Sequence, residues 1–89
     1  MPSRLRLTNP PRRTADGLTP EVLRKHAYHD QRTLPLSNRT VDFYIALLAE
    51  AGRRGPGAVD PTKLFGYGPA DIQLLTRKLV DAGLVEVAR

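Results

Sequence analysis

His26, His29 and Asp30 carry the most obvious candidate chemistry of the chain, because they stand together near the end of a segment with helical character. Histidines three residues apart on a helix lie on or near one face and can share a metal ion. No third strong ligand follows at a suitable spacing, and no His-Glu-x-x-His pattern occurs. We therefore interpret these residues as an exposed helix end and expect no metal site.

Gly66 and Gly68 flank a tyrosine directly before another helix signal, an order that can cradle a phosphate group at a helix N-terminus. The segment lacks the Lys-Ser/Thr pair of a P-loop and the third glycine of a dinucleotide fingerprint. No serine is placed with a histidine and an acid in a recognisable nucleophile motif. A chain of 89 residues is also too short to enclose a substrate pocket of the usual size. We therefore expect no enzyme, no catalytic residue and no cofactor.

The net charge of +5 is concentrated in the first part of the chain. Residues 1–39 carry eight basic and three acidic side chains, whereas residues 40–89 carry six of each. Any electrostatic grip on phosphate would therefore come mainly from the N-terminal part. The absence of cysteine excludes disulfides and thiolate metal sites. No apolar run resembles a membrane span or a signal-peptide core, so we expect a cytoplasmic protein that does not enter a membrane.

A chain of this length allows one domain. We predict a flexible basic arm over residues 1–18 and a folded domain over residues 19–89, with its core in residues 37–88. The arm is rich in proline and arginine and has no helical period. It is either a solvated tail, a basic arm that lies along DNA phosphate or in a minor groove, or a segment that orders on contact with a partner.

Two helices are predicted in the first part of the folded domain. The first runs from a cap at Thr19 to about Asp30, and the second starts after a cap at Ser37 or Asn38. We expect Gly52 to stop the second helix in the left-handed conformation. Its amphipathic stripe comprises Val41, Tyr44, Ile45, Leu48 and Ala51, widened by Phe43 and Leu47.

The last thirty residues predict a very short strand at residues 58–59, a short helix after a cap at Asp60, a glycine-rich turn, a longer helix over residues 69–82 and a strand over residues 84–87. Leu64 and Phe65 are the expected apolar contribution of the short helix. Tyr67 is expected to plug the turn as a core residue, the alternative being an exposed contact residue. Gly83 is expected to end the longer helix in the left-handed conformation. The core-facing residues of that helix are Ile72, Leu75 and Leu79, with Val80 beside them and Leu74 off the stripe.

The order of elements over residues 40–88 resembles a winged helix-turn-helix domain. The ending Leu79-Val-Asp-Ala-Gly-Leu-Val-Glu-Val87 is similar to the end of the recognition helix and the first wing strand of bacterial regulators of the multiple-antibiotic-resistance type. It is also similar to the small DNA-reading domain at the end of DNA translocases. The resemblance implies a small, mainly α domain with two very short strands, four helices and a flexible basic arm.

The resemblance also implies a DNA-binding protein that regulates transcription or DNA processing, with double-stranded DNA as its partner and plausibly a homodimer. The exposed face of the helix at 69–82 would enter a major groove, where Gln73 can pair with adenine and Arg77 with guanine or phosphate. Arg24, Lys25 and Arg32 would add phosphate contacts. The expected nucleic-acid-binding residues are Arg4, Arg6, Arg12, Arg13, Arg39, Arg53, Arg54, Lys63, Gln73, Thr76, Arg77 and Lys78. The alternative is that the helix face is merely solvated.

Two departures favour a different function. The sequence leaves no room for a returning wing strand after residues 84–87, so that strand is expected to pair with residues 58–59 or with a second copy of itself. Asp71 and Asp81 make the long helix neutral, and Asp71 would face phosphate unfavourably unless it accepts a hydrogen bond from cytosine or turns aside. The alternative function is a protein-interaction module, such as a phage- or plasmid-type adaptor or an inhibitor of a host enzyme. An RNA-associated protein is a third interpretation, although no aromatic stacking platform is evident.

Overall fold

In the computed structural model, residues 4–11, 19–54 and 58–88 are described. They form a small, mainly helical domain, as predicted. The α-helices and strands are β1 (Arg4–Leu7), α1 (Pro20–His29), α2 (Asn38–Arg54), α3 (Pro69–Asp81) and β2 (Val85–Ala88), joined by two short 3₁₀ helices, η1 (Gln31–Thr33) and η2 (Pro61–Lys63).

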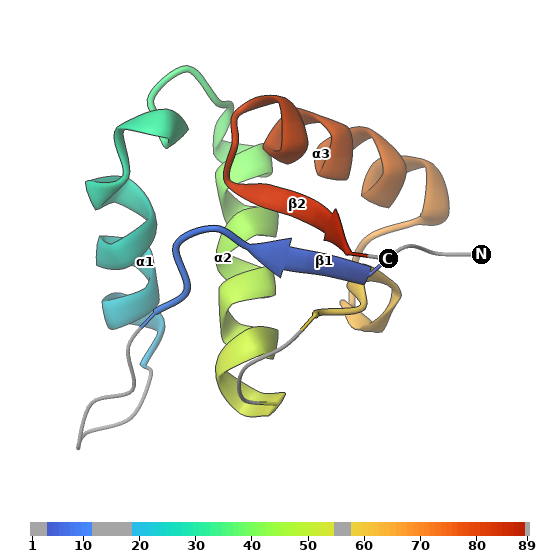
Figure 1. Ribbon diagram of the computed structural model, residues 1–89, viewed down its shortest axis with the longest axis horizontal. Coiled ribbons are helices and arrows are strands. Elements are labelled where there is room, and N and C mark those ends of the chain that lie inside the picture. Colours follow the sequence, from blue (N-terminus) through green and yellow to red (C-terminus); the bar gives the residue numbers. More distant parts are fainter. Residues whose placement is uncertain (1–3, 12–18, 55–57, 89) are drawn as a thin grey trace.

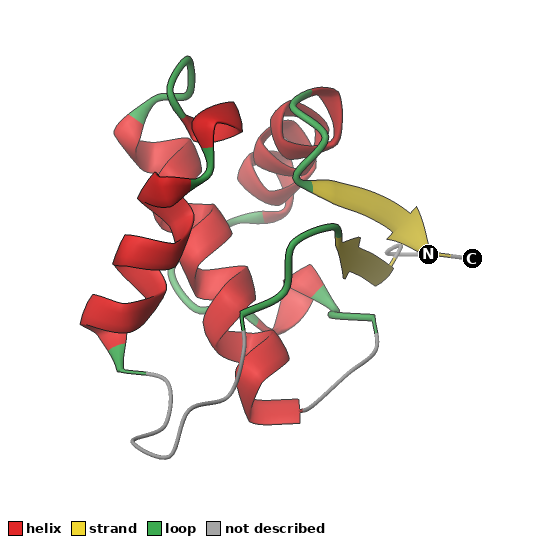
Figure 2. Cartoon of the chain, turned by 60° about the vertical axis from the view of Figure 1, so that its left-hand side comes forward, coloured by secondary structure: helices red, strands yellow, loops and turns green. Residues whose placement is uncertain are grey.

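The helices and the sheet enclose one hydrophobic core. In Figure 1, α2 passes behind the two-stranded sheet, with α1 on one side of α2 and α3 on the other. Both α1 and α3 pack against α2, and α3 also packs against β2. Figure 2 shows the strands on one side of the helical layer. The fully buried side chains come from both strands and from every α-helix.

The helix starts follow the predicted local signals. Thr19 Oγ1 accepts a hydrogen bond from the backbone N–H of Val22 at 3.2 Å, which caps α1. Ser37 Oγ accepts from the N–H of Thr40 at 3.3 Å, which identifies Ser37 as the cap of α2.

The prediction that Gly52 stops α2 is wrong, because α2 continues to Arg54 and Gly52 has no positive φ. The arginines that follow Gly52 are good helix formers and prolong the helix.

The N-terminal segment departs most from the predicted fold. Arg4–Leu7 is a strand paired antiparallel with β2, in a register that runs from Arg4 opposite Ala88 to Leu7 opposite Val85. The flexible arm predicted for residues 1–18 is therefore wrong for these four residues. Their sequence alternates arginine and leucine, and the structure buries both leucines and exposes both arginines. That is the period of two expected of a strand with one face on the core.

The strand β1 lies between two partners, β2 on one side and Val59 on the other. The N–H of Leu5 donates to the carbonyl of Val59 at 2.8 Å, and the N–H of Val59 donates to the carbonyl of Leu5 at 2.7 Å. Residues 58–59 thus provide an isolated bridge to β1 and do not pair with β2. The predicted pairing of the last strand with residues 58–59 is wrong, because β1 occupies the place between them.

The turn before α3 contains three predicted core residues, of which two pack against the core and one does not. Leu64 and Tyr67 pack against the core, whereas Phe65 is 97% exposed, so its predicted contribution to the core is wrong. The 3₁₀ helix η2 ends at Lys63, and Leu64 has an extended backbone. Successive side chains on extended backbone point to opposite sides, which turns Phe65 away from the core.

The C-terminal end of α3 follows the sequence prediction except at Val80, which was predicted beside the core-facing residues and is 36% exposed. Gly83 adopts a φ of 80° and redirects the chain into β2, which confirms the predicted left-handed stop. Leu75 and Leu79 are buried, and Leu74 is 54% exposed and lies off the apolar stripe, as expected. The outward face of α3 is therefore left open to solvent.

Candidate nucleic-acid interface

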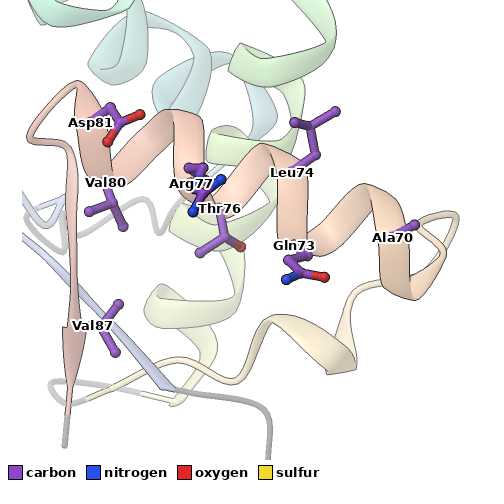
Figure 3. Close-up of a pocket in the computed structure, with 8 residues that line it drawn as sticks. All are labelled: Ala70, Gln73, Leu74, Thr76, Arg77, Val80, Asp81 and Val87. Atoms are coloured by element: carbon purple, nitrogen blue, oxygen red, sulfur yellow. The ribbon is translucent and has the colours of Figure 1, made fainter.

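The outward face of α3 and the end of β2 border a hollow with a volume of about 490 Å³ (Figure 3). Because α3 turns sharply into β2 at Gly83, the helix and the strand diverge and leave this space between them. The hollow is lined by Ala70, Gln73, Leu74, Thr76, Arg77, Val80, Asp81 and Val87.

The lining of the hollow has a mixed chemistry. Leu74, Val80 and Val87 are its large exposed apolar side chains. Gln73 and Arg77 are exposed polar side chains that can donate several hydrogen bonds. The surface can therefore accept a ligand that offers both hydrogen-bond acceptors and apolar contacts.

The predicted contact residues of α3 are not equally accessible. Gln73 and Arg77 line the hollow, and Lys78 is exposed on the same helix without lining it. The hydroxyl oxygen of Thr76 is buried and has no hydrogen-bond partner within the described part of the chain. The Thr76 hydroxyl therefore does not reach the surface, unlike the amide of Gln73 and the guanidinium of Arg77.

An ion pair neutralises the acidic residue at the start of α3. Arg39 Nη2 lies 2.9 Å from Asp71 Oδ2, and both side chains are about half exposed. The Arg39 guanidinium also lies 5.9 Å from the centroid of the Tyr67 ring. Tyr67 in turn meets Phe43 edge to face, with the ring centroids 5.1 Å apart. An exposed pair of this kind contributes little to stability, but it turns the carboxylate of Asp71 toward α2.

A second group of cations lies on β1 and η2. Arg4 and Arg6 project from the face of the sheet opposite the core, and Lys63 is exposed on η2. Hydrogen bonds from the hydroxyl and backbone N–H of Thr62 lower the pKa of Asp60, and the charges of Lys63 and Arg4 lower it further. Lys63 and Arg4 therefore lie near the same carboxylate.

The other predicted phosphate contacts lie elsewhere or are not described. Arg53 is near the C-terminal end of α2, 3.9 Å from Glu50. That end of α2 lies away from α3 (Figure 1). Arg24 and Lys25 are exposed on α1. Arg12 and Arg13 lie outside the described residues, as does the side chain of Arg54.

Arg32 is engaged within the fold instead of facing a ligand. Its Nη2 lies 2.6 Å from Asp30 Oδ2, and its Nη1 donates to the carbonyl of Gly83 at 2.6 Å and to Thr8 Oγ1 at 3.1 Å. Its guanidinium thus joins the end of α1, the residue after β1 and the turn between α3 and β2. The predicted phosphate contact by Arg32 is not available in this arrangement.

One of the two histidines of α1 forms a hydrogen bond within the fold. His26 Nε2 donates to the carbonyl of Asn9 at 2.7 Å. Among the described residues, no group of three His, Cys, Asp or Glu side chains could hold a metal ion. None of the described helices is long and apolar enough to cross a membrane.

Comparison with known proteins gives no relative. The chain matches no protein-family model, and no curated protein and no solved structure matches it significantly. The surface itself must therefore support any functional assignment.

Proposed function

We propose that this protein binds double-stranded DNA through the outward face of α3 and regulates transcription or DNA processing. The observation that carries the proposal is the pairing of Asp71 with Arg39, which removes the carboxylate that would repel phosphate. Gln73, Arg77 and Lys78 remain as exposed side chains of that face. Such groups are suited to base edges in a major groove and to phosphate.

The position of β1 supports the same proposal. In a winged helix-turn-helix, a returning wing strand lies beside the first wing strand. The sequence predicts no returning strand after residues 84–87. In the structure, β1 lies between β2 and Val59 and supplies the missing neighbour. The lone strand and the charge of Asp71, which counted against DNA binding, are thus accounted for, whereas Asp81 remains exposed in the lining of the hollow.

The free cations provide the expected electrostatic contribution. Among the described residues, no ion pair engages Arg4, Arg6, Lys63, Arg77 or Lys78. Each phosphate that a cation neutralises releases counterions and steepens the salt dependence of binding. If all five contact phosphate, the logarithm of the binding constant should fall with the logarithm of salt concentration at a slope of about −4 to −5.

The test is fluorescence anisotropy of a labelled duplex over a salt series, with two double variants of equal charge. Arg77→Ala/Lys78→Ala removes two cations from α3, and Arg24→Ala/Lys25→Ala removes two from α1. We expect the α3 variant to lose more affinity than the α1 variant and to reduce the slope by about 2. No binding by the parent protein at low salt would refute the proposal. Equal losses in the two variants would refute the assignment to α3.

One observation favours a second candidate function, a protein-interaction module. Leu74, Val80 and Val87 lie around one hollow and are 54%, 36% and 48% exposed. Apolar side chains gathered on a surface mark a protein contact site more often than scattered ones do. Leu74→Ser would weaken such a complex strongly, and the affinity of the complex would depend little on salt. The same substitution would leave non-specific DNA binding nearly unchanged.

A further inference from the structure

The outer edge of β2 has unused backbone hydrogen-bonding groups. Leu5 directs both its N–H and its carbonyl to Val59, so Leu5 and the residue opposite it, Val87, form a non-hydrogen-bonded pair. The N–H and carbonyl of Val87 therefore point away from β1. No strand lies beyond β2 among the described residues. An edge of this kind is a template for another strand.

We infer that a second copy of the chain occupies this edge, with the two β2 strands antiparallel and Val87 opposite Val87 of the other copy. A two-fold axis makes such an interface self-complementary, because each copy contributes the same N–H and carbonyl. In this register the two Val87 residues exchange two backbone hydrogen bonds. The four-residue length of β2 limits the interface to a short segment.

The charges on the outer face of the sheet select this register over its neighbour. Within one copy, Arg6 is opposite Glu86 and Arg4 is opposite Ala88. With Val87 at the two-fold axis, Glu86 faces Ala88 of the other copy, and Arg4 of that copy comes next in the same row. The long side chain of Arg4 can reach Glu86 over the small alanine. A shift that placed Glu86 opposite itself would set two carboxylates side by side, which is destabilising.

The symmetry of this dimer has a consequence for α3. Val87 lines the hollow beside α3, so α3 lies on the face of the sheet to which the Val87 side chain points. A two-fold axis perpendicular to the sheet keeps both copies of that face on one side. Both α3 helices then project from the same side of the joined sheet. Contact of one DNA duplex with both α3 helices rests on the proposed DNA binding, whereas the dimer does not.

A single cysteine tests the register directly, because the chain has no cysteine of its own. Residues of a hydrogen-bonded antiparallel pair have Cα atoms about 5.5 Å apart, within the range that a disulfide spans. Val87→Cys should therefore form a covalent dimer under mild oxidation. Glu86→Cys is the matched control, because its two copies would lie roughly 8 Å apart and should not cross-link. Cross-linking of the Glu86→Cys variant in place of the Val87→Cys variant would overturn the register.

A proline variant tests the interface without disrupting the fold. Val87→Pro removes an N–H that β1 does not use, and edge strands tolerate proline where the N–H faces outward. In sedimentation equilibrium, we expect dissociation of the dimer to become roughly 10- to 100-fold easier than for the parent chain. Circular dichroism verifies that the fold is retained. A parent chain that stays monomeric at millimolar concentration would overturn the inference.

DNA binding separates this inference from the proposed function. On a duplex long enough for both α3 helices, the Val87→Pro variant should bind at least 10-fold more weakly than the parent chain, with a shallower salt slope. Equal binding would refute the contact of one duplex with both helices. If the Val87→Cys variant cross-links and the protein binds no DNA, the proposed function is refuted and the dimer remains supported.

Discussion

Substitution of Asp30 by asparagine should destabilise the domain by an amount that depends on pH. The charge-assisted hydrogen bonds from the Arg32 side chain are the main reason that the pKa of Asp30 falls from 3.8 to about 2. The Asp30 side chain is only 8% exposed, whereas the Arg32 side chain is 39% exposed, so solvent screens this interaction in part. A pKa difference of this size corresponds to about 2 kcal/mol of stabilisation at neutral pH.

The sign of the pH dependence follows from the lowered pKa. The carboxylate is favoured in the folded state, so its contribution is fully present above the ordinary pKa of 3.8. It is lost as the pH falls from about 4 through 2, where the folded protein takes up the proton. We therefore expect the parent chain and Asp30→Asn to differ by about 2 kcal/mol in the free energy of unfolding at pH 7. The difference should shrink as the pH approaches 2.

Urea denaturation followed by far-ultraviolet circular dichroism at pH 7, 4 and 2 measures these differences. Asp42→Asn is the control, because Asp42 is exposed on α2, and its substitution should change the free energy of unfolding by less than about 0.5 kcal/mol at pH 7. A difference between the parent chain and Asp30→Asn that stays constant from pH 7 to pH 2 would refute the reasoning. So would equal stability of the two proteins at pH 7.

Two further predictions concern the core. Leu5→Ala removes a fully buried side chain from β1 and should lower the free energy of unfolding by about 2–5 kcal/mol, whereas Phe65→Ala should change it by less than about 0.5 kcal/mol. Equal urea midpoints for these variants would contradict the placement of β1 in the core. Burial raises the pKa of Tyr44 to about 12, and its hydroxyl has no hydrogen-bond partner within the described residues. Tyr44→Phe should therefore be neutral or stabilising, and a thermal midpoint several degrees lower would show that the hydroxyl is satisfied.

The features that could be predicted from the sequence depend on neighbouring residues. The capping hydroxyls of Thr19 and Ser37 each bond to a backbone N–H three residues ahead. Gly83 ends α3 through its own backbone conformation. Such short-range rules can be applied without knowledge of the tertiary structure. The apolar period of α2 likewise identified its buried face, including Tyr44 and Leu48.

The features that were missed depend on residues distant in sequence. Arg4 pairs with Ala88, and the side chain of Arg32 reaches Gly83. Nothing in the local pattern at Arg32 distinguishes a guanidinium that bonds to Asp30, Thr8 and Gly83 from one that is free to contact phosphate. The alternation of residues 4–7 was visible, but four residues among prolines and arginines indicate a strand only weakly. In this chain, the polar side chains of the candidate site were harder to place than the core, because their partners come from other elements.

The strand β1 contributes leucines to the core and arginines to the surface, which limits how the contribution of its arginines to binding can be tested. Leu5 and Leu7 are buried in the core, whereas Arg4 and Arg6 of the same strand face solvent. Deleting the N-terminal segment would remove both leucines together with both arginines, and the loss of core packing would mask any loss of phosphate contact. Arg4→Gln/Arg6→Gln leaves the leucines and the backbone pairing in place. A reduced salt slope in that variant, at unchanged stability, would therefore assign the arginines of β1 to nucleic-acid contact, which a truncation cannot do.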